Sequence, residues 1–240
     1  MNKDNIQQLM KRVYLWQTEN HTRWVKRSSG KIRFLKSTDW ERGVFWSAVA
    51  TAWQVSRDDD YHTGLMDYTL NTGFRPGPLP RFADDHVCMQ AYHPLFKEVN
   101  IPDVVTYSTR ALDIMLDDPK LGRKDWWWCD SLFMAPPVFA AMTAETGEQK
   151  YLDYMDTAWW DAVDNLYDPE SGLFYRDARY IPDGKGGELR EANGEKVFWS
   201  RGIGWVLAAV PRIMASMPED YPSRDKYITM FIALAEQVVQ

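Results

Sequence analysis

The sequence is poor in cysteine and histidine. Its 240 residues include two cysteines, Cys88 and Cys129, and four histidines. Two cysteines can form at most one disulfide, and neither they nor the histidines have the spacing of metal ligands relative to nearby acids. We therefore expect no metal centre and no bound cofactor.

Long apolar runs and recognisable targeting or nucleotide-binding motifs are also missing. No run of about 18 apolar residues exists, so a membrane span is excluded. The first residues carry charges but not the apolar centre of a signal peptide, which predicts a cytoplasmic protein, or a periplasmic one that has lost its leader. The G-K-G-G stretch at 184–187 lacks the frame of a phosphate-binding loop, and no G-x-S-x-G motif marks a serine nucleophile.

Basic charge is in short supply as well. The net charge is −6, and the basic residues are scattered rather than gathered on one stretch. Nucleic-acid binding depends on a clustered basic face, so we expect no nucleic-acid partner.

Apolar and aromatic residues, by contrast, are abundant. Hydrophobic residues make up 45% of the chain, enough for a large core, and 12 are tryptophan. The most informative stretch is K-D-W-W-W-C-D at 124–130, where three tryptophans lead into Asp130. Neighbouring helix positions point in different directions, so packing alone does not require three indoles in a row. Indoles beside a partly desolvated carboxyl are typical of a sugar-processing site.

Helical periodicity extends over almost the whole chain. After a first amphipathic helix near residues 6–17, apolar spacing predicts four helix pairs. The pairs are Gly43–Trp53 with Tyr61–Leu70, Asp85–Phe96 with Pro102–Leu116, Asp130–Thr146 with Gln149–Val163, and Gly202–Met217 with Arg224–Val239. The first helices begin alike, and the first two steps fit a two-helix repeat of roughly 40–47 residues. The sequence thus predicts an all-α array of hairpins in one domain, with a kink or break at Pro136-Pro137.

A segment without helical periodicity separates the third helix pair from the fourth. It runs from 165 to 198 and contains two short β-type runs, 173–175 and 196–199, the second after an Asn-Gly turn. We expect a β-hairpin insert that passes over the mouth of the domain.

Two acids are the leading catalytic candidates, and each has a plain structural alternative. Asp130 could be a catalytic acid or base, or simply a helix N-cap. A helix start favours the ionised carboxylate, so desolvation would have to dominate if Asp130 is to hold a proton. The Asp84-Asp85-His86 run could supply a second acid, or be a capped helix start with a solvated histidine; the sequence does not distinguish Asp84 from Asp85. If the inner helices form a ring, both acids meet at one mouth.

Two arginines are candidates for anion binding. Arg201, in F-W-S-R-G-I-G-W, could bind a substrate carboxylate with both guanidinium nitrogens, or be a surface residue. Gly202 and Gly204 would let the backbone approach a ligand. Arg176, beside Asp177 in the insert, could be part of a solvated ion pair.

These blocks carry a family resemblance. In order, W-W-C-D-S-L-F-M-A-P-P, T-G-E-Q-K-Y-L-D, G-L-F-Y-R-D and F-W-S-R-G-I-G-W resemble glycoside hydrolase family 105, the unsaturated rhamnogalacturonyl hydrolases, and their relatives in family 88, the unsaturated glucuronyl hydrolases. The resemblance implies an (α/α)6 barrel. It implies removal of a 4,5-unsaturated uronic acid, galacturonyl or glucuronyl, from the non-reducing end of lyase-generated oligosaccharides such as those from pectin. The implied chemistry is hydration of the C4=C5 double bond.

The resemblance also implies roles for individual residues. Asp130 matches the family's general acid and base and Asp85 its second aspartate, while Arg201 matches a substrate-pocket arginine. Trp205, the tryptophans at 126–128, Trp40, His86 and Arg176 would complete the substrate-binding set. Arg176 replaces a frequent histidine and Ile203 a frequent asparagine, so specificity should differ.

Length and function leave alternatives open. Four helix pairs are fewer than six, so we expect a barrel truncated at its C-terminus, with exposed apolar faces that favour dimerisation or aggregation. An inverting glycosidase acting on saturated sugars through an aspartate pair, and a non-catalytic sugar-binding protein, are the two other functions compatible with the sequence.

Overall fold

Helices dominate the structure, a computed structural model in which residues 2–239 are described. The long helices and the short ones around them follow the chain in this order: α1 (Lys3–Glu19), α2 (Trp40–Ser56), α3 (Asp59–Thr72), the 3-10 turn η1 (Ala83–Asp85), α4 (Met89–Val99), α5 (Pro102–Asp117), α6 (Gly122–Asp125), α7 (Ser131–Met134), α8 (Pro136–Thr146), α9 (Lys150–Leu166), α10 (Ser200–Met214) and α11 (Arg224–Val239). Two strand pairs are formed by β1 (Trp24–Lys26) with β2 (Ile32–Phe34), and by β3 (Tyr167–Asp168) with β4 (Leu173–Phe174).

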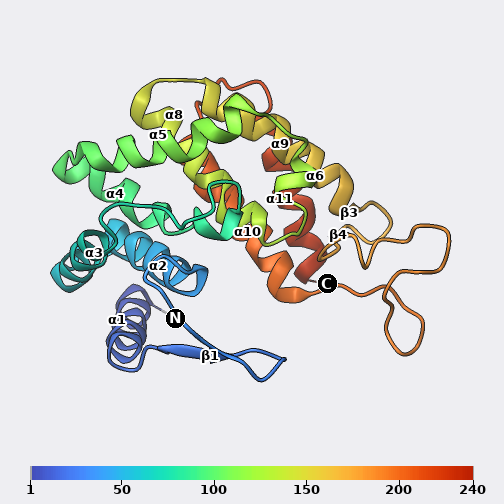
Figure 1. Cartoon of the computed structure of the whole chain (residues 1–240), viewed down its shortest axis with the longest axis horizontal. Helices are drawn as coiled ribbons and strands as arrows, with labels where there is room; N and C mark the ends of the chain where they lie inside the picture. Colours follow the sequence, from blue (N-terminus) through green and yellow to red (C-terminus); the bar gives the residue numbers. More distant parts are fainter. Residues whose placement is uncertain (1, 240) are drawn as a thin grey trace.

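The four predicted helix pairs are confirmed, and they stand in sequence order around an arc (Figure 1). The first helices of the pairs, α2, α4, α8 and α10, contact one another in turn and form the inner row. Their partners α3, α5, α9 and α11 pack on the outside, and α1 contacts α2. Among the described residues, none of these helices is long and apolar enough to cross a membrane.

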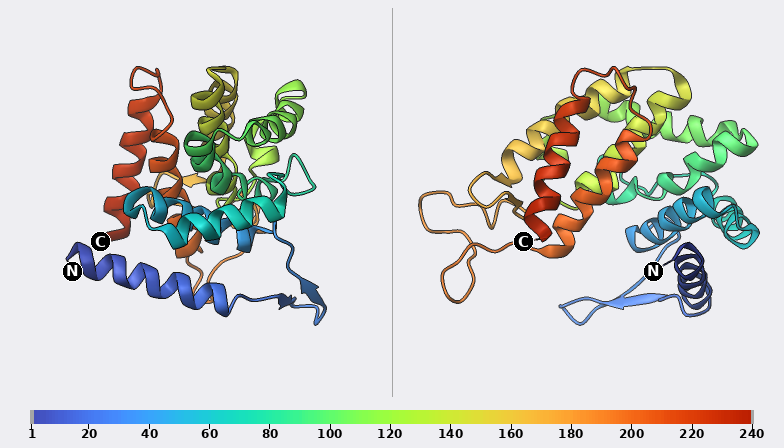
Figure 2. Two further views of the ribbon diagram at one scale, coloured as in Figure 1. Left: turned by 90° about the vertical axis from the view of Figure 1, so that its left-hand side faces the viewer. Right: turned by 180° about the vertical axis from the view of Figure 1, so that it is seen from behind.

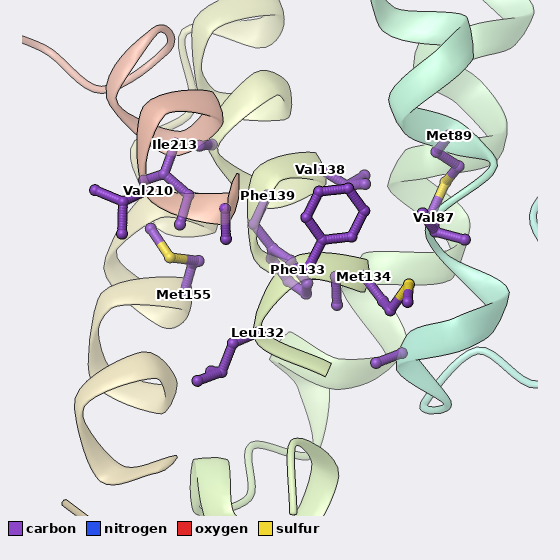
Figure 3. Close-up of a cluster of buried hydrophobic side chains, with 14 of the residues drawn as sticks. Val87, Met89, Leu132, Phe133, Met134, Val138, Phe139, Met155, Val210 and Ile213 are labelled. Atoms are coloured by element: carbon purple, nitrogen blue, oxygen red, sulfur yellow. The ribbon is translucent and has the colours of Figure 1, made fainter. Parts of the chain in front are cut away.

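The core lies where α7 and α8 meet their neighbours. Helix α8 has apolar residues on all sides, so it can be stable only with other elements around it. Figure 3 shows side chains from α7 and α8 between others from α4, α9 and α10. These buried side chains are Leu132, Phe133, Met134, Val138 and Phe139, with Val87 and Met89 on one side and Met155, Val210 and Ile213 on the other.

Two helix starts differ from the simple periodic pattern. The predicted break at Pro136-Pro137 is confirmed: α7 ends at Met134, and α8 begins at Pro136, because a proline is favoured in a first helical turn and costs a hydrogen bond in an interior one. The predicted helix from Asp85 is wrong at its start, since α4 begins only at Met89. Both irregular segments precede an inner helix and carry an acid.

The strands also differ in part from the prediction. The predicted run at 173–175 is confirmed as β4, but its partner is β3; the run at 196–199 is not a strand, and Lys196 only bridges Arg190. The rest of the insert projects sideways from the helices as a loop (Figures 1 and 2). The β1–β2 hairpin was not predicted, and it projects from the body after α1 (Figure 2).

Candidate active site

The starts of the inner helices come together and bring the chemically interesting side chains to one mouth. Helix α7 contacts both η1 and α10. Trp40, at the start of α2, shares a cavity of about 390 Å³ with Asp84 and Asp85 of η1. Asp130 directly precedes α7.

Asp130 is half-buried and is not a conventional helix cap. It stands at the N-cap position of α7, yet its side chain makes no capping hydrogen bond. Its Oδ1 instead accepts a hydrogen bond from the Cys129 thiol, with 3.4 Å between sulfur and oxygen. Burial raises the pKa of Asp130, while the thiol and the positive charges of Arg176 and Arg201 oppose that rise. The carboxyl is therefore available to a ligand.

The charge of Asp130 acts on the carboxyl of Asp84. Asp85, the predicted second acid, is held by backbone hydrogen bonds and lies on the same cavity as Asp84, so its catalytic role stays a prediction. The Asp85 Oδ2 accepts a hydrogen bond of 2.7 Å from the backbone N–H of Leu79, and its carbonyl accepts one of 2.8 Å from Gly77. A Cβ on Gly77 would overlap the Asp85 carboxyl. Asp85 thus holds the 77–79 loop against η1.

Asp84 carries a strongly perturbed carboxyl. Burial is the largest cause, and the negative charges of Asp130, Asp85 and Glu41 add to it, so the pKa of Asp84 is raised to about 7. Arg33 partly offsets the effect. With its pKa at about 7, the Asp84 carboxyl keeps its proton below neutral pH, close to the half-buried Asp130.

Two guanidinium groups lie on the ring of Trp199, just before α10. The Cζ of Arg201 is 4.1 Å from the ring centroid, and that of Arg176 is 5.4 Å from it. Asp177 is buried, so the alternative of a solvated ion pair with Arg176 is wrong. Asp177 pairs with Arg176 at 3.0 Å and with Arg179 at 2.7 Å. Because Arg179 already compensates the charge of Asp177, positive charge remains at the mouth for an anionic ligand.

Cys129 connects these groups. Its thiol donates to Asp130, and its backbone N–H donates to the carbonyl of Arg176 over 2.8 Å. A Cβ on Gly202 would overlap the Cys129 sulfur and the Trp199 ring. The expectation that Gly202 lets a ligand approach is therefore corrected: it lets α10 approach Cys129. A Cβ on Gly204 would meet nothing within 4 Å.

The three consecutive tryptophans separate into different environments. Trp126 is fully buried against Phe139, so its predicted place in the pocket is wrong. Trp128 stacks on Phe82 with ring centroids 5.4 Å apart, and Trp127 is 45% exposed beside it. Trp127 and Phe82 thus supply exposed aromatic surface near the acids, and the buried Trp128 packs against both of them.

The remaining predicted substrate contacts have mixed outcomes. His86 is corrected: it is fully buried, its Nε2 lies 2.7 Å from the Pro80 carbonyl, and burial lowers its pKa to about 4. Trp205 is half-buried against Phe133 in α7. Trp40 lies on the same cavity as Asp84.

The sequence did not predict three parts of this site: Trp199, Cys129 and the β1–β2 hairpin, whose residues line the cavity with Asp84. Trp199 and Cys129 adjoin predicted residues in the two quoted tryptophan blocks, so proximity in sequence could have found them. Among the described residues, no group of three or more histidine, cysteine or acidic side chains is arranged to hold a metal ion.

Inner and outer helices around a mouth with two acids, two arginines and exposed indoles define a helical-hairpin protein equipped for an anionic sugar. Residues 9–240 match the sequence model of Glycosyl Hydrolase Family 88. The chain belongs to this family, and the resemblance to family 105 and its relatives in family 88 is confirmed.

Two relatives and two solved structures illustrate the similarity. An unsaturated 3S-rhamnoglycuronyl hydrolase from Alteromonas sp. is 36% identical over 177 residues, covering 65% of this chain and 41% of the relative. One of the same name from Formosa agariphila is 32% identical over 219 residues, covering 86% and 58%. The chain thus spans about half the length of these relatives.

The solved structures support the fold. A family 88 glycosyl hydrolase from Bacteroides vulgatus is 26% identical with a TM-score of 0.76, covering 84% of this chain and 61% of that one. A structure from Salmonella enterica, described as a possible member of the GH105 family, has the same TM-score at 15% identity, covering 99% and 66%. The second likeness concerns the fold alone.

Proposed function

We propose that this protein removes a 4,5-unsaturated uronic acid from the non-reducing end of an oligosaccharide by hydrating the C4=C5 double bond. The observation that carries the proposal is the placement of two acids with raised pKa values, Asp84 and Asp130, where the positive charges of Arg176 and Arg201 act on Asp130. An unsaturated uronate needs both features, because C4 must be protonated while the carboxylate attached to C5 is bound.

The two arginines would link binding to protonation. The charges of Arg176 and Arg201 favour the ionised form of Asp130 in the free protein. A uronate carboxylate bound to them would cancel that influence, so the pKa of Asp130 would rise and its proton would become available. Substrate binding therefore prepares the acid.

The chemistry balances with these groups alone. Asp130 gives its proton to C4, and water adds at C5, where one of its protons stays on the new hydroxyl while the other returns to the Asp130 carboxylate. The hemiketal at C5 then opens to a ketone and leaves a hemiacetal at C1. The hemiacetal collapses to an aldehyde, the bond from C1 to the next sugar breaks, and the hydroxyl proton passes to the departing oxygen. Trp127 and Phe82, which are exposed, would pack against the sugar rings, with Trp128 supporting them from below.

The names of the two relatives suggest the next sugar. Both are called unsaturated 3S-rhamnoglycuronyl hydrolases. We therefore include rhamnose-linked unsaturated glycuronyl oligosaccharides among the proposed substrates, ahead of pectin-derived ones.

The test uses the ultraviolet absorbance of the conjugated double bond. Wild-type protein should abolish it with lyase-generated oligosaccharides, and Asp130→Asn should not. Asp164→Asn, which changes an exposed acid on α9, is the matched control and should act like the wild type. If wild-type protein leaves the absorbance intact but cleaves the matching saturated sugars, the protein is an ordinary glycosidase.

A further inference from the structure

The segment before α2 concentrates positive charge in an otherwise acidic chain. Between Glu19 and Asp39 there is no acidic residue. The same stretch holds six basic ones: Arg23, Lys26, Arg27, Lys31, Arg33 and Lys36. The basic residues are therefore not evenly scattered, and the cluster coincides with the β1–β2 hairpin.

This hairpin is held beside Asp84. Arg33, in β2, pairs with Asp39 at 2.6 Å and with Glu41 at 2.7 Å, both at the start of α2. The positive charge of Arg33 acts on Asp84. These ion pairs neutralise the charge of Arg33 and fix the hairpin against the start of α2.

Three other cations of the hairpin have no such partner. Lys26, Arg27 and Lys31 are exposed, and they take part in no ion pair within the described part of the chain. Lys26 and Arg27 line the cavity of about 390 Å³ that also contains Asp84. Arg27 and Lys31 line a second cavity of about 430 Å³ toward the hairpin tip. A path lined by free cations thus leads away from the acids.

We propose that the β1–β2 hairpin binds the anionic groups, carboxylates or sulfate esters, of the sugars that follow the unsaturated residue. This inference rests on the proposed function, because it concerns the remainder of the same substrate. A polysaccharide that yields an unsaturated uronate carries further charges along its length, and Lys26, Arg27 and Lys31 offer successive partners for them. Nucleic acid is disfavoured because Asp84 and Asp85 line the same cavity.

The experiment removes the free charges while keeping the length of the side chains. The variant Lys26→Gln/Arg27→Gln/Lys31→Gln is compared with wild type on an unsaturated anionic tetrasaccharide and on an unsaturated uronate with an uncharged leaving group. We expect KM for the tetrasaccharide to rise about tenfold at low salt, which corresponds to about 1.4 kcal/mol over the three lost exposed contacts. We expect kcat, and both constants for the uncharged substrate, to stay unchanged.

The control variant is Arg110→Gln, which removes an exposed cation from the outer helix α5. It should leave KM for the tetrasaccharide unchanged. A desulfated tetrasaccharide separates the two anions: loss of the difference between variant and wild type assigns the contacts to sulfate, and persistence assigns them to carboxylate.

Two failures remain distinguishable. Equal KM values for wild type and the triple variant on the anionic tetrasaccharide overturn the role of the hairpin. Wild-type protein that leaves the double bond intact overturns the proposed function instead. Calorimetric titration of both proteins with the same tetrasaccharide then still decides whether the three cations bind it.

Discussion

Removing the Asp84 charge should change how stability depends on pH. The pKa of Asp84 is raised from an ordinary 3.8 to about 7, mainly by burial and then by the charge of Asp130. A group whose pKa is higher in the folded state stabilises the protein below its unfolded pKa, and this contribution is lost as pH rises through the folded pKa. The wild type should therefore lose unfolding free energy between about pH 4 and pH 7.

The magnitude follows from the size of the shift. At 1.36 kcal/mol per unit, a rise from 3.8 to about 7 corresponds to about 4 kcal/mol for a fully shielded group. Because Asp84 is only half-buried, we expect about 2 kcal/mol.

The assay is urea denaturation followed by tryptophan fluorescence, from pH 4 to pH 8, for wild type, Asp84→Asn and the exposed control Asp164→Asn. The Asp84→Asn protein should gain stability relative to wild type as the pH rises, and the control should run parallel to wild type. A constant difference between Asp84→Asn and wild type at all pH values would refute the reasoning.

Three further predictions concern the mouth. Asp130→Asn should lower kcat for the unsaturated substrate about 10²–10⁴-fold with little change in the fluorescence-monitored unfolding curve, and an unchanged kcat would exclude Asp130 as the acid. Arg201→Lys should raise KM about tenfold, because a lysine cannot hold a carboxylate with two nitrogens; steady-state kinetics with KM unchanged would contradict this. Gly202→Ala should lower the unfolding free energy by about 1–3 kcal/mol because its Cβ meets the Cys129 sulfur and the Trp199 ring. Gly204→Ala, whose Cβ meets nothing, should not, and adding Cys129→Ala to Gly202→Ala should recover only part of the loss in urea denaturation, because the Trp199 overlap remains.

Periodicity was sufficient for the helical framework. The four helix pairs and the break at Pro136 follow from apolar spacing and from the missing N–H of proline, which are local properties. The β1–β2 hairpin was missed because its strands have three residues each, too few for a period-2 pattern to stand out.

The site was only partly predictable, because orientation depends on tertiary contacts. The sequence indicates acids near 84–86 and at 130, but only the tertiary structure shows that Asp85 accepts a hydrogen bond from the backbone N–H of Leu79, while the Asp84 carboxyl is affected by the charge of Asp130. In the same way, consecutive residues at 126–128 look equivalent in sequence, yet Trp126 lies in the core and Trp127 is exposed.

The most direct test of the central claim is the first product formed in D2O, observed by NMR at early times with wild-type protein. Protonation of C4 by an acid on one side of the sugar predicts a single deuterium at C4 in one configuration, together with loss of the C4=C5 bond. A released unsaturated uronic acid that retains the double bond and carries no deuterium at C4 would contradict the account.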